Sequence, residues 1–74
     1  MTRLAPTGNI TNNIQELRIS KHLTQQDLAE AVGVTRATIL ALERGDYNPS
    51  LELAFRISRY FKLGIEELFR FNAK

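Results

Sequence analysis

Apolar residues recur at helical spacing along most of the chain, in short segments separated by turn-forming residues. Ile14 and Leu17 stand three positions apart, which predicts a first helix that runs to about Lys21. Asn12 or Asn13 stands where an N-cap belongs, because an asparagine side chain can accept a hydrogen bond from a free amide of the first turn. The pattern therefore opens with one short amphipathic helix.

Two further helices are predicted on either side of Gly33. Thr24 resembles an N-cap, because Asp27 stands three residues later and can complete a capping box. Another helix begins at Thr35 and ends at Gly45, which stands where a left-handed C-cap residue belongs. The residues expected to face inward on these two helices are Leu28, Ala29, Val32, Ile39 and Leu42.

The segment GDYNPS after the third helix has turn chemistry, since Pro49 keeps the residue before it out of helical geometry. Ser50 can cap a fourth helix, which we expect Gly64 to end, and a short fifth helix follows. We identify no segment that alternates with period two, so the pattern predicts an all-α domain of five short helices. The inward residues expected on the last two helices are Leu53, Ala54, Ile57, Tyr60, Phe61, Ile65, Leu68 and Phe69.

Gly33 suggests how the second and third helices are joined. A glycine can adopt the positive φ that a sharp change of direction requires. Ala29, one helical turn earlier, has almost no side chain, so the next helix can cross close to its backbone. This is the physical logic of a helix-turn-helix unit, whose second helix can enter a DNA major groove. Any helical hairpin with a glycine turn would give the same pattern.

Outside the periodic region, the two ends of the chain show no helical pattern. Residues 1–10 contain Pro6 and Gly8, and we expect them to form a flexible N-terminal tail. The expected division is that tail, a single domain at 11–71 and a short C-terminal end at 72–74. A length of 74 residues suits one domain with one small core.

Composition argues against several classes of function. The chain has no cysteine and one histidine, His22, so we expect no disulfide and no metal site, and no cofactor is indicated. It has no apolar run of about 20 residues and no signal-peptide pattern, so we expect no membrane partner and a cytoplasmic location. Ser20, His22 and the scattered carboxylates do not assemble a nucleophile, a base and an oxyanion site. We therefore expect neither an enzyme nor a small-molecule substrate.

Two stretches, LTQQDLAEAVGVTRATILALERG and YNPSLELAFRISRYF, carry a resemblance to a known family. They resemble the Cro/repressor-type, or Xre-like, helix-turn-helix transcriptional regulators over roughly residues 12–70. The resemblance implies a compact five-helix, lambda-repressor-like domain that binds double-stranded DNA. The residues that fall at the family's spacing are Gln25, Leu28, Ala29, Gly33, Val34, Ile39, Leu42, Glu43, Gly45, Pro49 and Ser50.

The resemblance also implies which residues contact DNA. The helix that opens at Thr35 corresponds to the recognition helix, with its first side chains facing base edges. Arg36 is the best candidate for base readout, because a guanidinium can pair with both O6 and N7 of a guanine. Ala37 offers only apolar contact, and Thr38 can bond a phosphate or a base edge. The full set of residues expected to contact DNA is Gln25, Thr35, Arg36, Ala37, Thr38, Ala41, Arg44, Tyr47 and Asn48.

Arg18 and Glu43 correspond to a pair that, in the family, forms a partly buried ion pair joining the first and third helices. With Gly33, they form the structural part of the predicted site.

Charge argues against tight binding by one copy, because the segment from Thr24 to Ser50 holds two arginines against four acidic residues. Phosphate neutralisation dominates affinity for DNA, so we expect a monomer to bind weakly and a homodimer to act on DNA.

Two functions stay open. The sequence favours a sequence-specific DNA-binding regulator, acting as a repressor, that inserts the helix from about Thr35 to Arg44 into the major groove. The alternative is a protein-interaction module of the same fold, an antitoxin or adaptor, that binds a partner through its aromatic C-terminal surface. Most aromatic residues of that region are expected in the core, while Phe71 is expected outside, where it could form a symmetric dimer contact.

Overall fold

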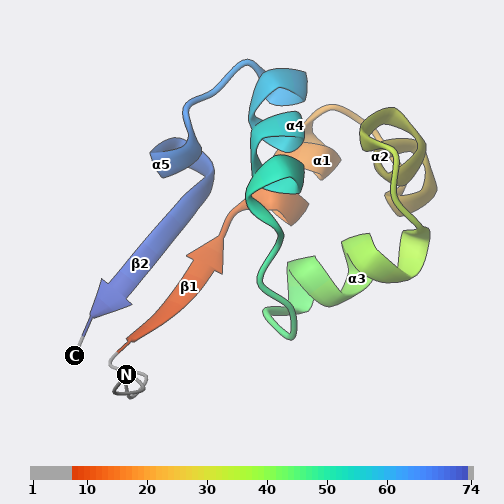
Figure 1. The fold of residues 1–74 in the computed structure, drawn as a ribbon. Coiled ribbons are helices and arrows are strands. Elements are labelled where there is room, and N and C mark those ends of the chain that lie inside the picture. Colours follow the sequence, from red (N-terminus) through yellow and green to blue (C-terminus); the bar gives the residue numbers. More distant parts are fainter. Residues whose placement is uncertain (1–7, 74) are drawn as a thin grey trace.

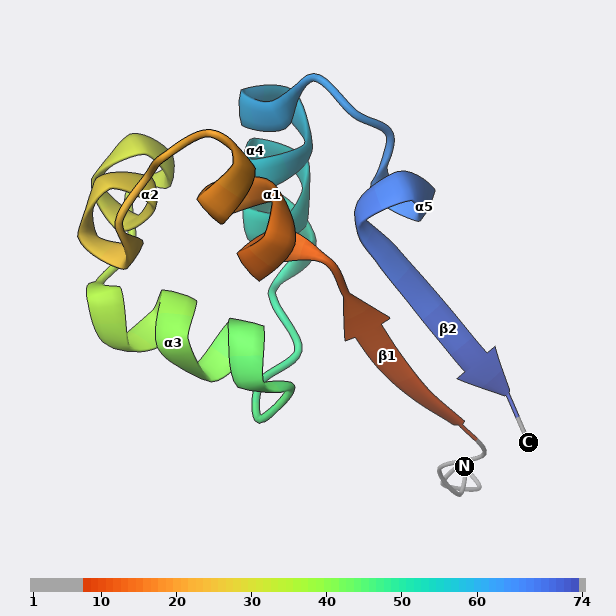
Figure 2. The ribbon, with the colours of Figure 1, turned by 180° about the vertical axis from the view of Figure 1, so that it is seen from behind.

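Five helices and a two-stranded antiparallel sheet make up the computed structural model, which describes residues 8–73. In Figures 1 and 2, α1, α2 and α4 form one group, while α3 and the two strands extend from one end of it. In both views β1 lies nearer to α3 than β2 does. The elements in chain order are β1 (Gly8–Asn12), α1 (Ile14–Ser20), α2 (Gln25–Val32), α3 (Arg36–Arg44), α4 (Leu51–Phe61), α5 (Ile65–Leu68) and β2 (Phe69–Ala73).

One apolar core joins the five helices. All of the inward residues predicted for α2 and α3 are buried in it. On the fourth helix, the prediction that Tyr60 faces inward is wrong, because this residue is 38% exposed. Phe55 also lies at the surface. Each helix therefore contributes a narrow apolar stripe to the core, whose buried residues are Ile14, Leu28, Ala29, Val32, Ile39, Leu42, Leu53, Ile57, Phe61 and Leu68.

Local sequence signals set most of the helix boundaries. Thr24 and Asp27 form the predicted capping box at the start of α2, with the Thr24 hydroxyl accepting from the Asp27 amide. Ser50 caps α4 in the same way, and Gly45 ends α3 in the left-handed conformation. The expectation that Gly64 ends α4 is wrong, because Lys62 takes up the left-handed conformation after Phe61. Gly64 instead precedes α5, and its amide donates to the Glu67 carboxylate.

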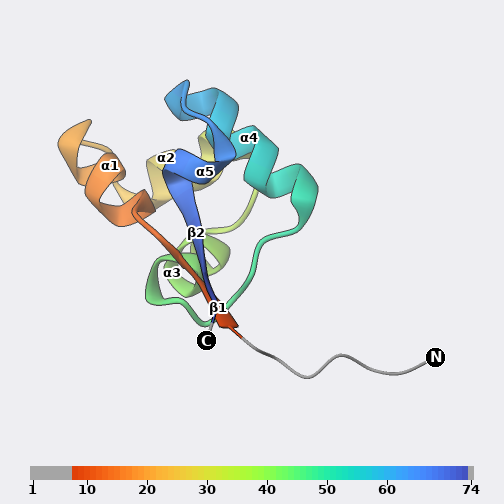
Figure 3. The ribbon, with the colours of Figure 1, turned by 90° about the vertical axis from the view of Figure 1, so that its left-hand side faces the viewer.

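The prediction of five helices is confirmed, but the fold is not purely all-α, because the described residues begin and end in two strands that pair with each other (Figure 3). Ile10 lies opposite Phe71 and Asn12 lies opposite Phe69 in the antiparallel register. Residues 8–10, which were expected in a flexible tail, are therefore part of a sheet, while 1–7 lie outside the described residues. The β2 sequence FRFN does alternate apolar and polar residues, a period-two signal that the helical interpretation of Phe69 obscured.

Candidate nucleic-acid interface

A buried polar network fixes α3 to the helices before it. The Arg18 guanidinium on α1 donates from Nε to Glu43 Oε2 at 2.6 Å and from Nη2 to Oε1 at 3.2 Å. Gln25, the first residue of α2, donates its Nε2 to the same Oε1 at 3.1 Å. Arg18 Nη1 also donates to the carbonyl of Leu23 in the loop before α2 at 2.8 Å, and Glu43 is therefore the residue at which α1, α2 and α3 are joined. The Arg18–Glu43 pair is nearly enclosed, with side chains only 11% and 3% exposed.

The turn between α2 and α3 is built on Gly33. Its φ of 78° lies in the left-handed region, where a side chain is strained. The backbone amide of Val34 then donates to the carbonyl of Ala29, which closes the end of α2. Arg56 on α4 donates from Nη1 to the Val32 carbonyl at 3.3 Å and lies 3.0 Å from where a Cβ of residue 33 would stand. The turn is therefore held from a third helix.

α3 presents opposite faces to the core and to the outside. Ile39 and Leu42 are fully buried. The N-cap Thr35 accepts a hydrogen bond from the Thr38 amide, and the two threonine hydroxyls lie 3.0 Å apart. The residues of the outer face are the exposed Arg36, Ala37 and Leu40 and the half-buried Thr38 and Ala41. The leading edge of α3 is thus uncovered by the described part of the chain.

The loop after α3 adds a second exposed group of predicted site residues. Arg44 lies in the last turn of α3 with its Nε 3.6 Å from the Asp46 carboxylate, and both side chains are 65% exposed. Tyr47 and Asn48 are exposed next to it, and Tyr47 lines a shallow hollow with Ala37 and Thr38 on α3. Exposed ion pairs of this kind contribute little stability, so Arg44 can exchange its partner for a phosphate at low cost.

The predicted site residues thus fall into two groups in space. One group lies on the outer side of α3 and in its following loop, with Thr38 and Ala41 half-buried and the others exposed: Thr35, Arg36, Ala37, Thr38, Ala41, Arg44, Tyr47 and Asn48. The other group lies in the polar network and the turn: Arg18, Gln25, Gly33 and Glu43. Gln25 was expected to bond a phosphate, and in this structure its amide is hydrogen-bonded to Glu43.

The charge near α3 differs from the count made along the sequence. Residues 24–50 carry two arginines against four acidic residues, but Glu43 is neutralised by Arg18 from outside that segment. Asp46 is paired with Arg44. When Arg18 is counted with Glu43, the region around α3 has a smaller net negative charge than the count over residues 24–50 gives. The electrostatic argument against DNA binding is therefore weaker.

The capping box at the start of α2 displaces the pKa of Asp27. Hydrogen bonds from the Thr24 backbone amide and the Thr24 side chain lower the pKa of this carboxyl below its ordinary value of 3.8. The cause is the capping box itself, because the ionised carboxylate accepts those bonds better than the neutral acid. The start of α2 is therefore best capped when Asp27 is ionised.

Sequence reasoning missed Arg56 and Asn12 as residues that position the site. Asn12, at the end of β1, donates its Nδ2 to the Leu42 carbonyl at 2.9 Å and accepts from the Ile14 amide at 3.1 Å. Both residues support α3 or its turn across a long sequence separation, which no local pattern reveals. The local signals available were the spacing of Glu52 and Arg56, four residues apart on one helix, and the N-cap position predicted for Asn12 or Asn13.

No helix among residues 8–73 has the length and apolar character needed to span a membrane. Nor do these residues bring together three or more acidic, histidine or cysteine side chains that could hold a metal ion.

Two consecutive helices joined by a glycine turn, with the second packed on its inner side and free on its outer side, define a helix-turn-helix domain. The sequence profile of the helix-turn-helix family matches residues 14–68. The chain therefore belongs to this family, in its Xre-like form. The matched region contains the whole polar network and all five helices, and it leaves out both strands.

Three known proteins illustrate the likeness. An HTH-type transcriptional regulator of Methanothermobacter thermautotrophicus is 56% identical over 57 residues, which cover 76% of this chain and 83% of the relative. The cryptic phage CTXphi transcriptional repressor RstR of Vibrio cholerae is 33% identical and covers 78% of this chain and 52% of its own. The restriction-modification controller protein C.AhdI of Aeromonas hydrophila has a similar structure, with a TM-score of 0.69 at 31% identity over 74% of this chain and 83% of its own.

Proposed function

We propose that the protein is a sequence-specific, double-stranded-DNA-binding transcriptional regulator that acts as a repressor, with α3 inserted into the major groove. One observation carries the proposal: the polar network and the glycine turn fix α3 to the helices on its inner side, while its leading edge is exposed. A recognition helix needs both properties, since its side chains must reach base edges in a fixed register. One relative, RstR, is named as a repressor, which supports this role.

Arg36 is the residue to which we assign base readout. It is the first residue of α3 and is exposed, so its guanidinium can reach the paired acceptors of a guanine. Ala37 and Ala41 would contact thymine methyl groups or sugar, and Thr38 a phosphate or base edge. Arg44, Tyr47 and Asn48 would contact the backbone, which fixes position but carries no sequence information.

Selection of bound duplexes from a random pool tests the proposal. We expect the wild-type chain to enrich one motif at low salt and Arg36→Ala to lose a guanine from that motif. Arg59→Ala is the matched control, because it removes the same charge from an exposed position on α4 and should leave the motif unchanged. Failure of the wild type to enrich any motif would contradict DNA readout, and an unchanged motif with Arg36→Ala would exclude this residue as the reader.

A protein-interaction module is the second candidate, favoured by the exposure of Leu51 and Phe55 on α4, at 71% and 51%. The salt dependence of the binding affinity distinguishes the two functions. Binding that depends on phosphates weakens steeply as salt rises, with a slope in log affinity close to the number of phosphates neutralised. An apolar protein interface should change little over the same range.

A further inference from the structure

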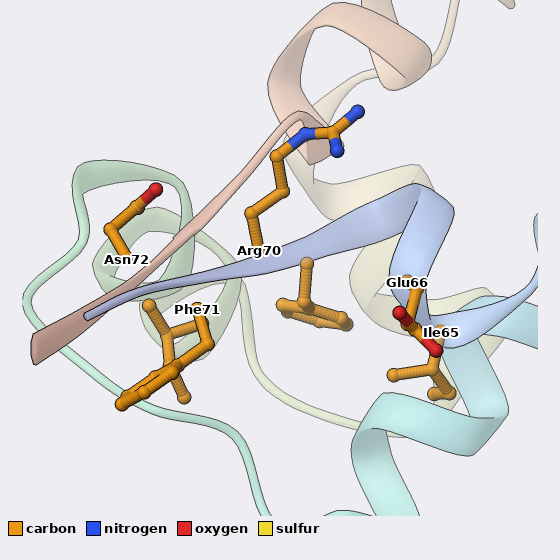
Figure 4. Close-up of a pocket in the computed structure, with 7 residues that line it drawn as sticks. Ile65, Glu66, Arg70, Phe71 and Asn72 are labelled. Atoms are coloured by element: carbon orange, nitrogen blue, oxygen red, sulfur yellow. The ribbon is translucent and has the colours of Figure 1, made fainter.

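A shallow hollow of about 510 Å³ lies between α2 and the second half of α4. Its lining includes Glu30, Ala31, Val32, Arg56, Arg59 and Tyr60. The groove over the sheet in Figure 4, which includes Phe71, shares no residue with this hollow. In Figures 1 and 2, the C-terminal end of α4 lies farther from α3 than its N-terminal end does. The hollow is therefore separate from both the sheet and the outer face of α3.

The surface around the hollow is positively charged. Residues 51–62 hold three exposed basic side chains against one exposed acidic side chain, a net charge of +2. On the other side, the Glu30 carboxylate accepts a hydrogen bond from Gln26 Nε2 at 2.8 Å, so it has a partner on its own helix. Arg59 forms no ion pair within residues 8–73. Arg59 is therefore the charge that a carboxylate from outside can neutralise.

An exposed row of side chains continues from the hollow along α4. Leu51, Phe55 and Arg59 stand four residues apart, so they lie on one side of the helix over a length of about 12 Å. Leu51 and Phe55 are both more than half exposed. A phosphate backbone would leave these apolar side chains uncovered, and a small molecule would be shorter than the row. A peptide segment with apolar side chains and carboxylates matches both the length and the charge.

We propose that the hollow and this row together, the α2–α4 surface, bind an acidic, amphipathic segment of a partner protein. Apolar side chains of the segment pack against Phe55 and Tyr60, and one of its carboxylates pairs with Arg59. The inference goes beyond the proposed function, because the α2–α4 surface contains no residue of the outer face of α3. The partner segment can therefore bind whether or not DNA is present.

Selection from a library of random peptides displayed on phage tests the chemistry of the partner. We expect the wild-type chain to enrich peptides that combine aliphatic or aromatic residues with aspartate or glutamate. Arg59→Glu should enrich peptides with fewer acidic and more basic residues, because like charges placed together across an interface are unfavourable. Failure of the wild type to enrich any peptide, or the same acidic preference with Arg59→Glu, would overturn the proposal.

Nuclear magnetic resonance of the isotope-labelled full chain, titrated with one enriched peptide, tests the location. Amide shifts should centre on Ala31, Phe55 and Tyr60. Arg59→Glu should weaken the affinity by about tenfold or more, whereas Arg59→Lys keeps the charge and should bind nearly as well as the wild type. Arg70→Glu is the matched control, because it reverses an exposed charge beside the groove over the sheet and should leave the affinity unchanged.

Three results would assign the peptide or the hollow differently, and each would overturn the proposal. Equal weakening by Arg70→Glu would place the peptide in the groove over the sheet. Displacement of the peptide by a duplex of random sequence would assign Arg59 to phosphate contacts. Assemblies of the chain alone that exceed a dimer and dissolve with Arg59→Glu would make a second copy the occupant, through the exposed Glu66 and Glu67 of its α5. Selection of duplexes by α3 is a separate experiment, so the proposed function would stand in all three cases.

Discussion

Glu43 accepts hydrogen bonds from two side chains on two other helices, Arg18 and Gln25. Its carboxylate is almost completely enclosed, so its charge has little contact with solvent. A buried charge is tolerated only while its partners remain in place. The orientation of α3 therefore depends on a few polar atoms as much as on the core.

Glu43→Gln should lower the free energy of unfolding by about 3 kcal/mol, because it leaves the buried Arg18 without a counter-charge. Chemical denaturation measures the loss. Glu16→Gln, an exposed position in the first turn of α1, is the control and should stay within about 0.5 kcal/mol of wild type. Equal losses in the two variants would show that the enclosed pair does not stabilise the fold.

The free energy of unfolding should depend on pH through Asp27. Its pKa in the folded protein lies below 3.8, so the contribution of its ionised form is present above pH 3.8 and is lost as pH falls through the lower folded value. Asp27→Asn, which resembles the protonated acid, should melt below the wild type at neutral pH and at the same temperature in strong acid. A difference in melting temperature that is constant across this range would contradict the assignment.

At the scale of elements, the turn before α3 depends on a residue from α4. The local sequence predicts the turn, because Gly33 follows a capped helix and precedes a threonine N-cap. It gives no sign of Arg56, which reaches the Val32 carbonyl from 24 residues away. The C-terminal end of α2 is thus held both by the core and by this contact from α4.

Gly33→Ala and Gly45→Ala form a matched pair that separates backbone strain from contact. Both glycines have φ near 80°, so each alanine should cost about 1–2 kcal/mol in strain. Only at Gly33 would the new Cβ press on Arg56, whereas open space surrounds Gly45. We expect the larger drop in melting temperature for Gly33→Ala. The difference between the two should disappear in an Arg56→Ala background, and its persistence there would exclude Arg56 as the cause.

The sheet is the element that sequence reasoning could not supply. The helices follow from caps and periodicity within about ten residues, but β1 and β2 are short and lie at opposite ends of the chain. Asn72 donates to the Thr11 hydroxyl across 61 residues, and no local pattern indicates such a partner. The alternation of apolar and polar residues in β2 can be recognised in the sequence, but it does not identify the strand with which β2 pairs.

For the molecule as a whole, the sequence indicates which residues lie together at the candidate site, but it does not indicate which contact each of them would make. The family resemblance placed the exposed residues of α3 on one helix, and the structure places them on one open face. Which base each side chain would read under the proposed function depends on the duplex, because an exposed side chain such as Arg36 would take up its contacts only in a complex. The polar network differs in this respect, since both partners of each bond belong to the chain.

Dimerisation and readout should be separable on DNA. We expect a homodimer on DNA with the exposed Phe71 as its symmetric contact. A palindromic duplex bound by two linked recognition helices gains affinity from the second contact, so Phe71→Asp should weaken binding by roughly 100-fold or more while the preferred half-site is kept. Arg36→Ala should do the reverse, changing the half-site while the dimer mass is unaltered. Titration of the selected duplex and of a single half-site measures both effects, since only the full palindrome should distinguish wild type from Phe71→Asp. Equal weakening on the half-site would mean that Phe71 acts within one copy, by supporting α3 rather than by joining two chains.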